Sequence, residues 1–149
     1  MEKIEFSKHI DAPREKVWQV LFSNDTYPDW TAFFCEGSHA VTDWQKGSKV
    51  WFLDKNQSGM MAEIEESKSP EFMSFATLGA VKNGVEDLES EEAQMCKGGH
   101  ENYYLADKNG GTELRVTLEG LEMPAEMSGF LLDAWPKAME KIKSLAETA

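Results

Sequence analysis

Long apolar runs are missing from this sequence. No stretch approaches the about 20 predominantly apolar residues that a membrane-spanning helix needs. The first residues, MEKIEFSKHIDAP, contain no long apolar segment and no small-residue cleavage site, so they do not resemble a signal peptide. We therefore expect a cytoplasmic protein.

Basic residues are scarce relative to acidic ones. The chain has 15 lysines and arginines against 27 aspartates and glutamates, which gives a net charge of −12. An electrostatic field of this sign repels nucleic-acid backbones and anionic lipid surfaces. The composition therefore argues against nucleic acid and membranes as partners.

Cysteine is rare as well. Cys35 and Cys96 are the two cysteines of the chain, and with no export signal they indicate reduced thiols rather than a disulfide framework. A histidine stands at the fourth position after each of them, His39 and His100, so a four-ligand zinc site can be written from these residues. Structural zinc sites usually have tighter and more regular ligand spacing, and we predict no metal site.

A complete phosphate-binding glycine loop is also absent. Gly79 and Gly84 have the spacing of the first part of a P-loop, but Val85 and Glu86 stand where that loop requires Lys and then Ser or Thr. A glutamate at this place would repel a phosphate. Asn83 and Gly84 instead have the composition of a two-residue hairpin turn. Because the phosphate-binding loop is incomplete, we predict no cofactor.

The sequence does contain an ordered series of amphipathic segments. Its 149 residues, 41% hydrophobic and 28% charged, fit one domain over residues 1–149. Pro13 and acidic neighbours predict the start of a helix over residues 11–24, which a short helical turn follows near residues 26–34. Alternating or apolar segments predict strands at 3–10, 38–44, 48–53, 60–67, 71–80, 100–107 and 112–121.

The chain ends in a long predicted helix, which follows the clearest strand. In that strand Leu114, Val116 and Leu118 alternate with polar residues, as expected for an antiparallel sheet with one buried face. The helix, over residues 123–149, contains Pro136 and an apolar stripe of 3.6-residue period. The stripe consists of Met127, Phe130, Leu131, Ala134, Trp135, Ala138, Ile142 and Leu145. The order of elements predicts an α+β fold in which a curved antiparallel sheet packs on the last helix.

Several segments together resemble a known superfamily. They are IDAPREKVWQVLFSNDTYPDW, GAVKNGVEDLESEEAQ, ENYYL, GGTELRV and WPKAMEKIKSLAE, and they span nearly the whole chain. The chain resembles the SRPBCC or START-like superfamily, in the branch related to the activator of the heat-shock chaperone ATPase. This resemblance implies a helix-grip fold: about seven curved antiparallel strands around a long C-terminal helix, with short N-terminal helices and a hydrophobic cavity.

The resemblance also implies the binding of a small hydrophobic molecule, lipid-like or aromatic, in that cavity. Taken alone, each apolar residue is better explained by ordinary core packing. The predicted ligand-binding residues are Trp30, Phe52, Met60, Ala62, Phe75, Tyr103, Phe130, Ala134 and Trp135.

Two other functions remain open. A cyclase or hydratase would need polar groups that converge in the cavity, and His9, Glu101, Tyr103 and Arg115 are the candidates. We expect Glu101 and Arg115 on solvent faces, and we predict no catalytic residue. The alternative is a co-chaperone-like module, with the acidic residues from Glu86 to Glu92 facing a basic partner.

Overall fold

The computed structural model describes residues 3–120 and 125–148, apart from the side chains of Glu92, Cys96 and Met127. Within these residues the helices and strands are, in chain order, β1 (Ile4–Ile10), α1 (Arg14–Leu21), α2 (Tyr27–Thr31), β2 (His39–Val41), β3 (Lys49–Leu53), β4 (Gly59–Lys68), β5 (Phe72–Lys82), β6 (Val85–Asp87), α3 (Glu91–Cys96), β7 (His100–Lys108), β8 (Gly111–Glu119) and α4 (Ala125–Glu147).

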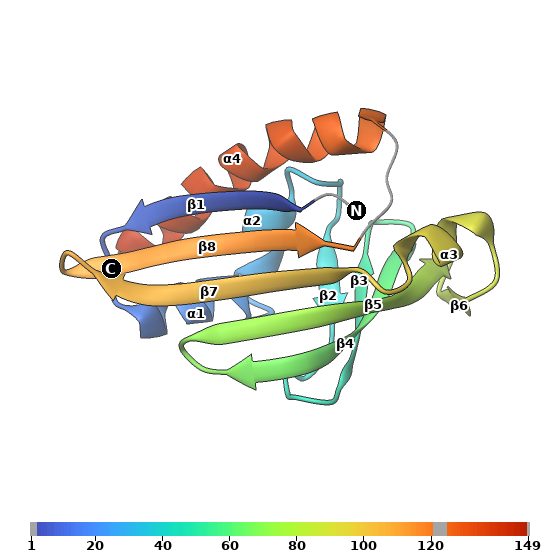
Figure 1. Ribbon diagram of the computed structural model, residues 1–149, viewed down its shortest axis with the longest axis horizontal. Coiled ribbons are helices and arrows are strands. Elements are labelled where there is room, and N and C mark those ends of the chain that lie inside the picture. The colour runs from blue at the N-terminus through green and yellow to red at the C-terminus, as the bar shows by residue number, and fades with distance from the viewer. Residues whose placement is uncertain (1–2, 121–124, 149) are drawn as a thin grey trace.

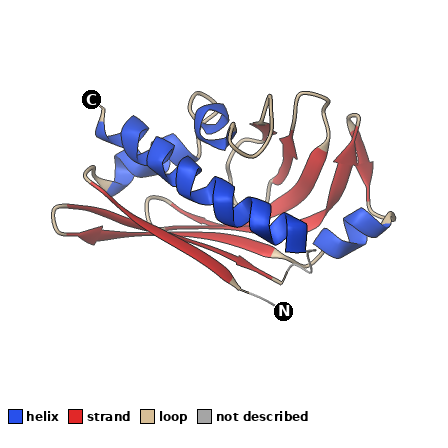
Figure 2. Ribbon diagram, turned by 90° about the horizontal axis from the view of Figure 1, so that it is seen from above, coloured by secondary structure: helices blue, strands red, loops and turns tan. Residues whose placement is uncertain are grey.

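The strands form one antiparallel sheet. Seven of them follow the order β1-β8-β7-β5-β4-β3-β2, and the short β6 pairs with β5 away from this path. The sheet curls into a half-barrel, and α4 runs along its concave side together with α1 and α2 (Figures 1 and 2). The predicted helix-grip fold is therefore confirmed.

The first and the last of the described strands in chain order, β1 and β8, pair with each other. Ile4 in β1 is opposite Leu118 in β8, and Ile10 is opposite Thr112. The buried hydroxyl of Thr112 donates a hydrogen bond to the carbonyl oxygen of Ala12 over 2.7 Å. This bond holds the turn from β1 into α1 against the start of β8.

The main core fills the space between the concave face and the helices. The predicted alternation in β8 is confirmed, because Leu114, Val116 and Leu118 are all buried there. From α4, Trp135, Ala138, Met139, Ile142 and Ala146 pack into the same cluster. Their spacing of three or four residues is that of one helix face.

The first turns of α4 depart from the predicted stripe. Phe130 is 46% exposed, so the prediction that it belongs to the buried stripe is wrong. Leu131 takes the inward position and packs against the core, and one residue along a helix turns the side chain by about 100°. Met127, also predicted on the stripe, lies outside the described side chains.

A second, smaller cluster lies apart from the main core, where β6 and α3 pack beside β5. It contains Leu53, Met61 and Val81, with Trp51 and Leu78 packed against it. Neither β6 nor α3 was predicted from the sequence.

The two glycines of this region have different roles. Asn83 and Gly84 both have positive φ, 51° and 81°, as the predicted two-residue hairpin turn requires. A Cβ on Gly79 would stand only 2.7 Å from a side-chain atom of Leu88. Gly79 therefore makes room for the segment that packs beside β5.

Candidate functional site

Aromatic side chains form a continuous layer between the concave face of the sheet and α4. Trp30 from α2 lies 5.9 Å from Trp135 of α4 and 6.4 Å from Tyr103 of β7, measured between ring centroids. Phe75 of β5 continues the layer, 5.9 Å from Tyr103 and 5.2 Å from Phe52 of β3. Five of the predicted ligand-binding residues thus come together in one cluster.

The other four predicted residues contribute no ring to this layer. Ala62 is buried in the same cluster, and Met60 is partly buried opposite Phe52. Ala134 is also buried, with 3% of its surface exposed, whereas Phe130 faces solvent.

Several rings of the layer were missed in the prediction of the site. They are Phe6, Phe22, Tyr27, Phe34 and Trp44, each with a ring centroid within 6 Å of another ring of the layer. Phe22, Phe34 and Trp44 come from connections between elements, where no periodicity assigns a side chain to one face. Tyr27 lies in the helical turn predicted near residues 26–34 but was not included in the predicted site.

A carboxyl group lies at this aromatic layer. Tyr103 donates a hydrogen bond from its hydroxyl to Oε2 of Glu101 over 2.8 Å. Burial raises the pKa of Glu101 to about 7, and the bond from Tyr103 opposes this rise only in part. The prediction that Glu101 faces solvent is wrong, since it stands two residues before Tyr103 in β7 and shares its face.

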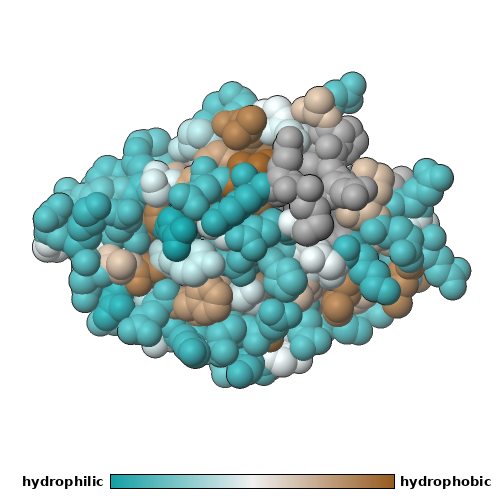
Figure 3. Space-filling view, in the orientation of Figure 1, coloured by the Kyte–Doolittle hydropathy of each residue, from teal (hydrophilic) through white to brown (hydrophobic). Residues whose placement is uncertain are grey.

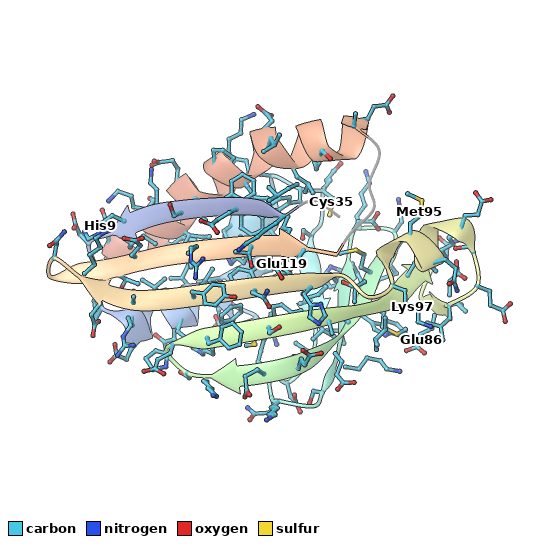
Figure 4. All side chains as sticks on the ribbon, viewed as in Figure 1. His9, Cys35, Glu86, Met95, Lys97 and Glu119 are labelled. Carbon is cyan, nitrogen blue, oxygen red and sulfur yellow. The ribbon has the colours of Figure 1, made fainter. Side chains whose placement is uncertain are left out.

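Other polar groups accompany this carboxyl. The pKa of Tyr27 is raised, mostly by burial and to a smaller extent by the negative charges of Glu101 and Cys35. Burial also raises the pKa of the Cys35 thiol. In Figure 4, Cys35 lies between the end of β8 and the start of α4. The indole nitrogen of Trp30 is buried and has no hydrogen-bond partner among the described residues.

The remaining catalytic candidates lie elsewhere. His9 has its Nε2 atom 3.0 Å from the Asp11 carboxylate at an exposed site. Arg115 stacks 4.3 Å from the ring centroid of Tyr104 and pairs with Glu5 over 3.3 Å. Arg115 is thus on the outer face of β8, as expected.

The histidines weighed as zinc ligands have other contacts. Nδ1 of His39 is 2.8 Å from the carbonyl oxygen of Gly37, and Nε2 of His100 is 3.4 Å from Glu65. The described part of the chain contains no group of three or more His, Cys, Asp or Glu residues that could hold a metal ion. The side chain of Cys96 lies outside the described residues.

Two surface hollows differ in their relation to the aromatic layer. One, of about 490 Å³, is lined by Glu65, Glu66, Lys68, Phe72, Ser74, His100, Asn102 and Glu119. It lies on the outer side of the sheet, which is largely hydrophilic (Figure 3). Its polar lining does not suit a hydrophobic ligand.

The other hollow, of about 210 Å³, lies between β1 and α4, beside Phe6 of the layer. It is lined by Phe6, Ser7, Lys8, Pro136, Met139 and Glu140. The ring of Phe6 stacks on Trp135 at 5.7 Å, and an ion pair joins Lys8 to Glu140. The hollow therefore touches the aromatic layer at Phe6, and its lining is partly apolar and partly polar.

Apolar side chains are also exposed on β6, on α3 and between these two elements. Val85 is 67% exposed and Leu88 is 51% exposed, and Met95 of α3 is exposed too. Glu86 and Met95 lie at this same end of the molecule in Figure 4. Among the described helices, none is both long and apolar enough to cross a membrane.

Comparisons with known proteins agree with this fold. The family model described as "Activator of Hsp90 ATPase homolog 1-like protein" matches residues 11–147. No curated protein matches the chain.

Several solved structures are similar. The solution structure of the Aha1 dimer from Colwellia psychrerythraea is 15% identical, with a TM-score of 0.77 over 99% of this chain and 98% of that chain. A protein from Mesorhizobium loti is 16% identical, with a TM-score of 0.76 over 97% and 96% of the two chains. For an AHSA1-like protein from Aeromonas hydrophila the identity is 19% and the TM-score is 0.64, over 98% and 92%.

Proposed function

Since this chain belongs to the family of activator of Hsp90 ATPase homolog 1-like proteins, within the SRPBCC superfamily, we propose that it binds a small hydrophobic molecule between the sheet and α4. The observation that carries this proposal is the continuous aromatic layer from Phe52 to Trp135. Aromatic and apolar linings with a few placed polar groups are typical of ligand sites. We expect an aromatic ligand, because ring faces and edges line the site from both the sheet and the helices.

Access to this layer is the second part of the proposal. The hollow between β1 and α4 measures about 210 Å³, less than the roughly 300–1,000 Å³ of typical sites for drug-sized ligands. We therefore expect a larger ligand to displace side chains as it enters. The ion pair between Lys8 and Glu140 stands at this hollow and would separate or shift during entry.

Binding can be tested with 2-naphthylmethanol as a neutral aromatic probe, titrated by calorimetry and followed by ligand-detected NMR. In Ala134→Trp a large ring enters the buried side of α4, and we expect this variant to lose the probe. Lys141→Trp adds the same ring at an exposed position of α4 and should bind as the parent does. Failure of the parent to bind this probe and its charged analogues, or equal binding by Ala134→Trp, would overturn the proposal. Native mass spectrometry of the purified protein would add support by detecting an apolar molecule that copurifies.

A second candidate function is a co-chaperone-like interaction with a heat-shock chaperone ATPase. It is favoured by the family description and by the exposed apolar residues Val85 and Leu88, which flank the acidic Glu86 and Asp87. Such a surface suits a partner with apolar and basic groups.

This candidate is tested by adding the protein to a purified chaperone and measuring ATP hydrolysis. We expect Val85→Asp to abolish any stimulation. Val41→Asp is the matched control, because Val41 is 54% exposed on β2 at a different part of the sheet. An unchanged ATPase rate with the parent protein excludes this function for the chaperone tested.

A further inference from the structure

The aromatic layer contains a carboxyl group that has no basic partner. The pKa of Glu101 is shifted by its burial and by the hydrogen bond from the hydroxyl of Tyr103. No described lysine or arginine contributes to this shift. Lys8, from the neighbouring hollow, is paired with Glu140 instead. A partly buried acid without a cation is costly in its charged form, and that cost is removed either by protonation or by a positive group beside the carboxylate.

One oxygen of this carboxyl is available to a ligand. Oε2 of Glu101 accepts the bond from Tyr103, whereas Oε1 has no hydrogen-bond donor among the described residues. Phe75 stands directly opposite Glu101 in the pairing of β5 with β7. Its ring is 5.9 Å from that of Tyr103, so Glu101 has two aromatic neighbours, one on the adjacent strand and one on its own.

We infer that the ligand of this site is a protonated amine on an apolar, ring-bearing body, and this inference rests on the proposed function. The ammonium group would pair with Glu101 by a charge-assisted hydrogen bond. The faces of aromatic rings attract a cation, most strongly where water is excluded. The net charge of −12 draws cations toward the protein, and a carboxylate ligand would be repelled by Glu101.

The affinity for such an amine should rise with pH. Burial raises the pKa of Tyr27, Tyr103 and Cys35, so these neighbours stay neutral through the neutral range. The residues of α4 that face the layer, among them Leu131 and Trp135, have no ionisable side chain.

Glu101 is then the group that changes its charge near neutrality, and its pKa is about 7. If the amine binds only the ionised form, its apparent affinity follows the ionised fraction of Glu101. That fraction, and the affinity with it, should increase by more than about tenfold from pH 5.5 to pH 8.

Three probes of one shape test this inference: 2-naphthylmethylamine, 2-naphthylmethanol and 2-naphthoate, titrated by calorimetry at pH 5.5 and pH 8. At pH 8 we expect the amine to bind at least about tenfold more tightly than the alcohol, and the carboxylate to bind most weakly. Glu101→Gln should remove the preference for the amine and its pH dependence. Glu119→Gln loses the same charge at a side chain that lines the outer hollow, and it should behave as the parent.

The parent protein alone also tests the role of the charge, so the inference stays testable even if Glu101→Gln does not fold. Its affinity for the amine, but not for the alcohol, should rise from pH 5.5 to pH 8, and an amine affinity that does not change with pH would overturn the inference. Equal binding of amine and alcohol by the parent would overturn the inference and leave the proposed function standing. If none of the three probes binds, both fail.

Discussion

Replacement of Glu101 by glutamine should stabilise the protein above neutral pH and change its stability little in acid. Glutamine has nearly the same shape, and its oxygen can still accept the hydrogen bond from Tyr103. What it removes is the ability to ionise. The effect therefore measures how much the buried charge of Glu101 costs the folded state.

The magnitude follows from the raised pKa. In the folded protein the pKa of Glu101 is about 7, against an ordinary value of 4.5. Between these values the folded state holds the proton and the unfolded state releases it, so the stability of the parent falls as pH rises. A change of one in pKa corresponds to about 1.4 kcal/mol, which gives an upper limit of about 3.4 kcal/mol. Because the side chain is only partly buried, we expect about 1–3 kcal/mol.

The assay is urea unfolding of the parent and of Glu101→Gln at pH 4 and pH 8. Other titrating groups are shared by the two proteins, so their contributions cancel in the difference. The variant should gain the expected free energy of unfolding at pH 8 but not at pH 4. If the difference between the proteins is the same at both pH values, to within about 0.5 kcal/mol, the assignment of Glu101 to a desolvated site is wrong. Glu119→Gln, at a carboxylate that pairs with Lys3 and has 42% of its side chain exposed, should show no such dependence.

Three further predictions concern the fold. A Cβ on Gly59 would stand 1.8 Å from a backbone oxygen, so Gly59→Ala should lower the free energy of unfolding in the same denaturation assay. A Cβ on Gly129 of α4 would meet nothing within 4 Å, so Gly129→Ala should raise the free energy of unfolding by about 0.5–1 kcal/mol. Ala134→Trp should lower the free energy of unfolding by about 1–3 kcal/mol, because Ala134 is buried; an unchanged melting temperature would reveal free space there. In hydrogen exchange by mass spectrometry, amides of Lys82–Gly99 should exchange faster than that of Val116, and equal protection would contradict this.

The fold was predictable where one rule covers a whole element. The two-residue period at Leu114, Val116 and Leu118 identified a strand with one buried face, and the 3.6-residue period identified α4. The same rule fails at Phe130, because a residue near the edge of an apolar stripe is buried only if another element covers it. That depends on where α4 sits on the sheet, which the periodicity of the helix alone does not give.

The candidate site was predictable in part. The period that places Tyr103 on the concave face also places Glu101 there, so the signal for the carboxyl was present in the sequence. The charge of the side chain led to the opposite expectation, since glutamate is rarely buried without a partner. Phe22 and Trp44 gave no such signal, because their positions depend on how the connections fold against the sheet.

The pairing of β1 with β8 also bears on the order in which the chain folds. β1 is synthesised before the other strands of the sheet, but its partner β8 is made after all of them. Hairpins such as β4–β5 and β7–β8 close locally, whereas the contact between Ile4 and Leu118 must close a loop of most of the chain. We therefore expect β1 to dock late, after the ribosome has released β8. Until then Phe6 remains without its partner strand, and the charged residues beside it, Glu5 and Lys8, limit its association with other chains.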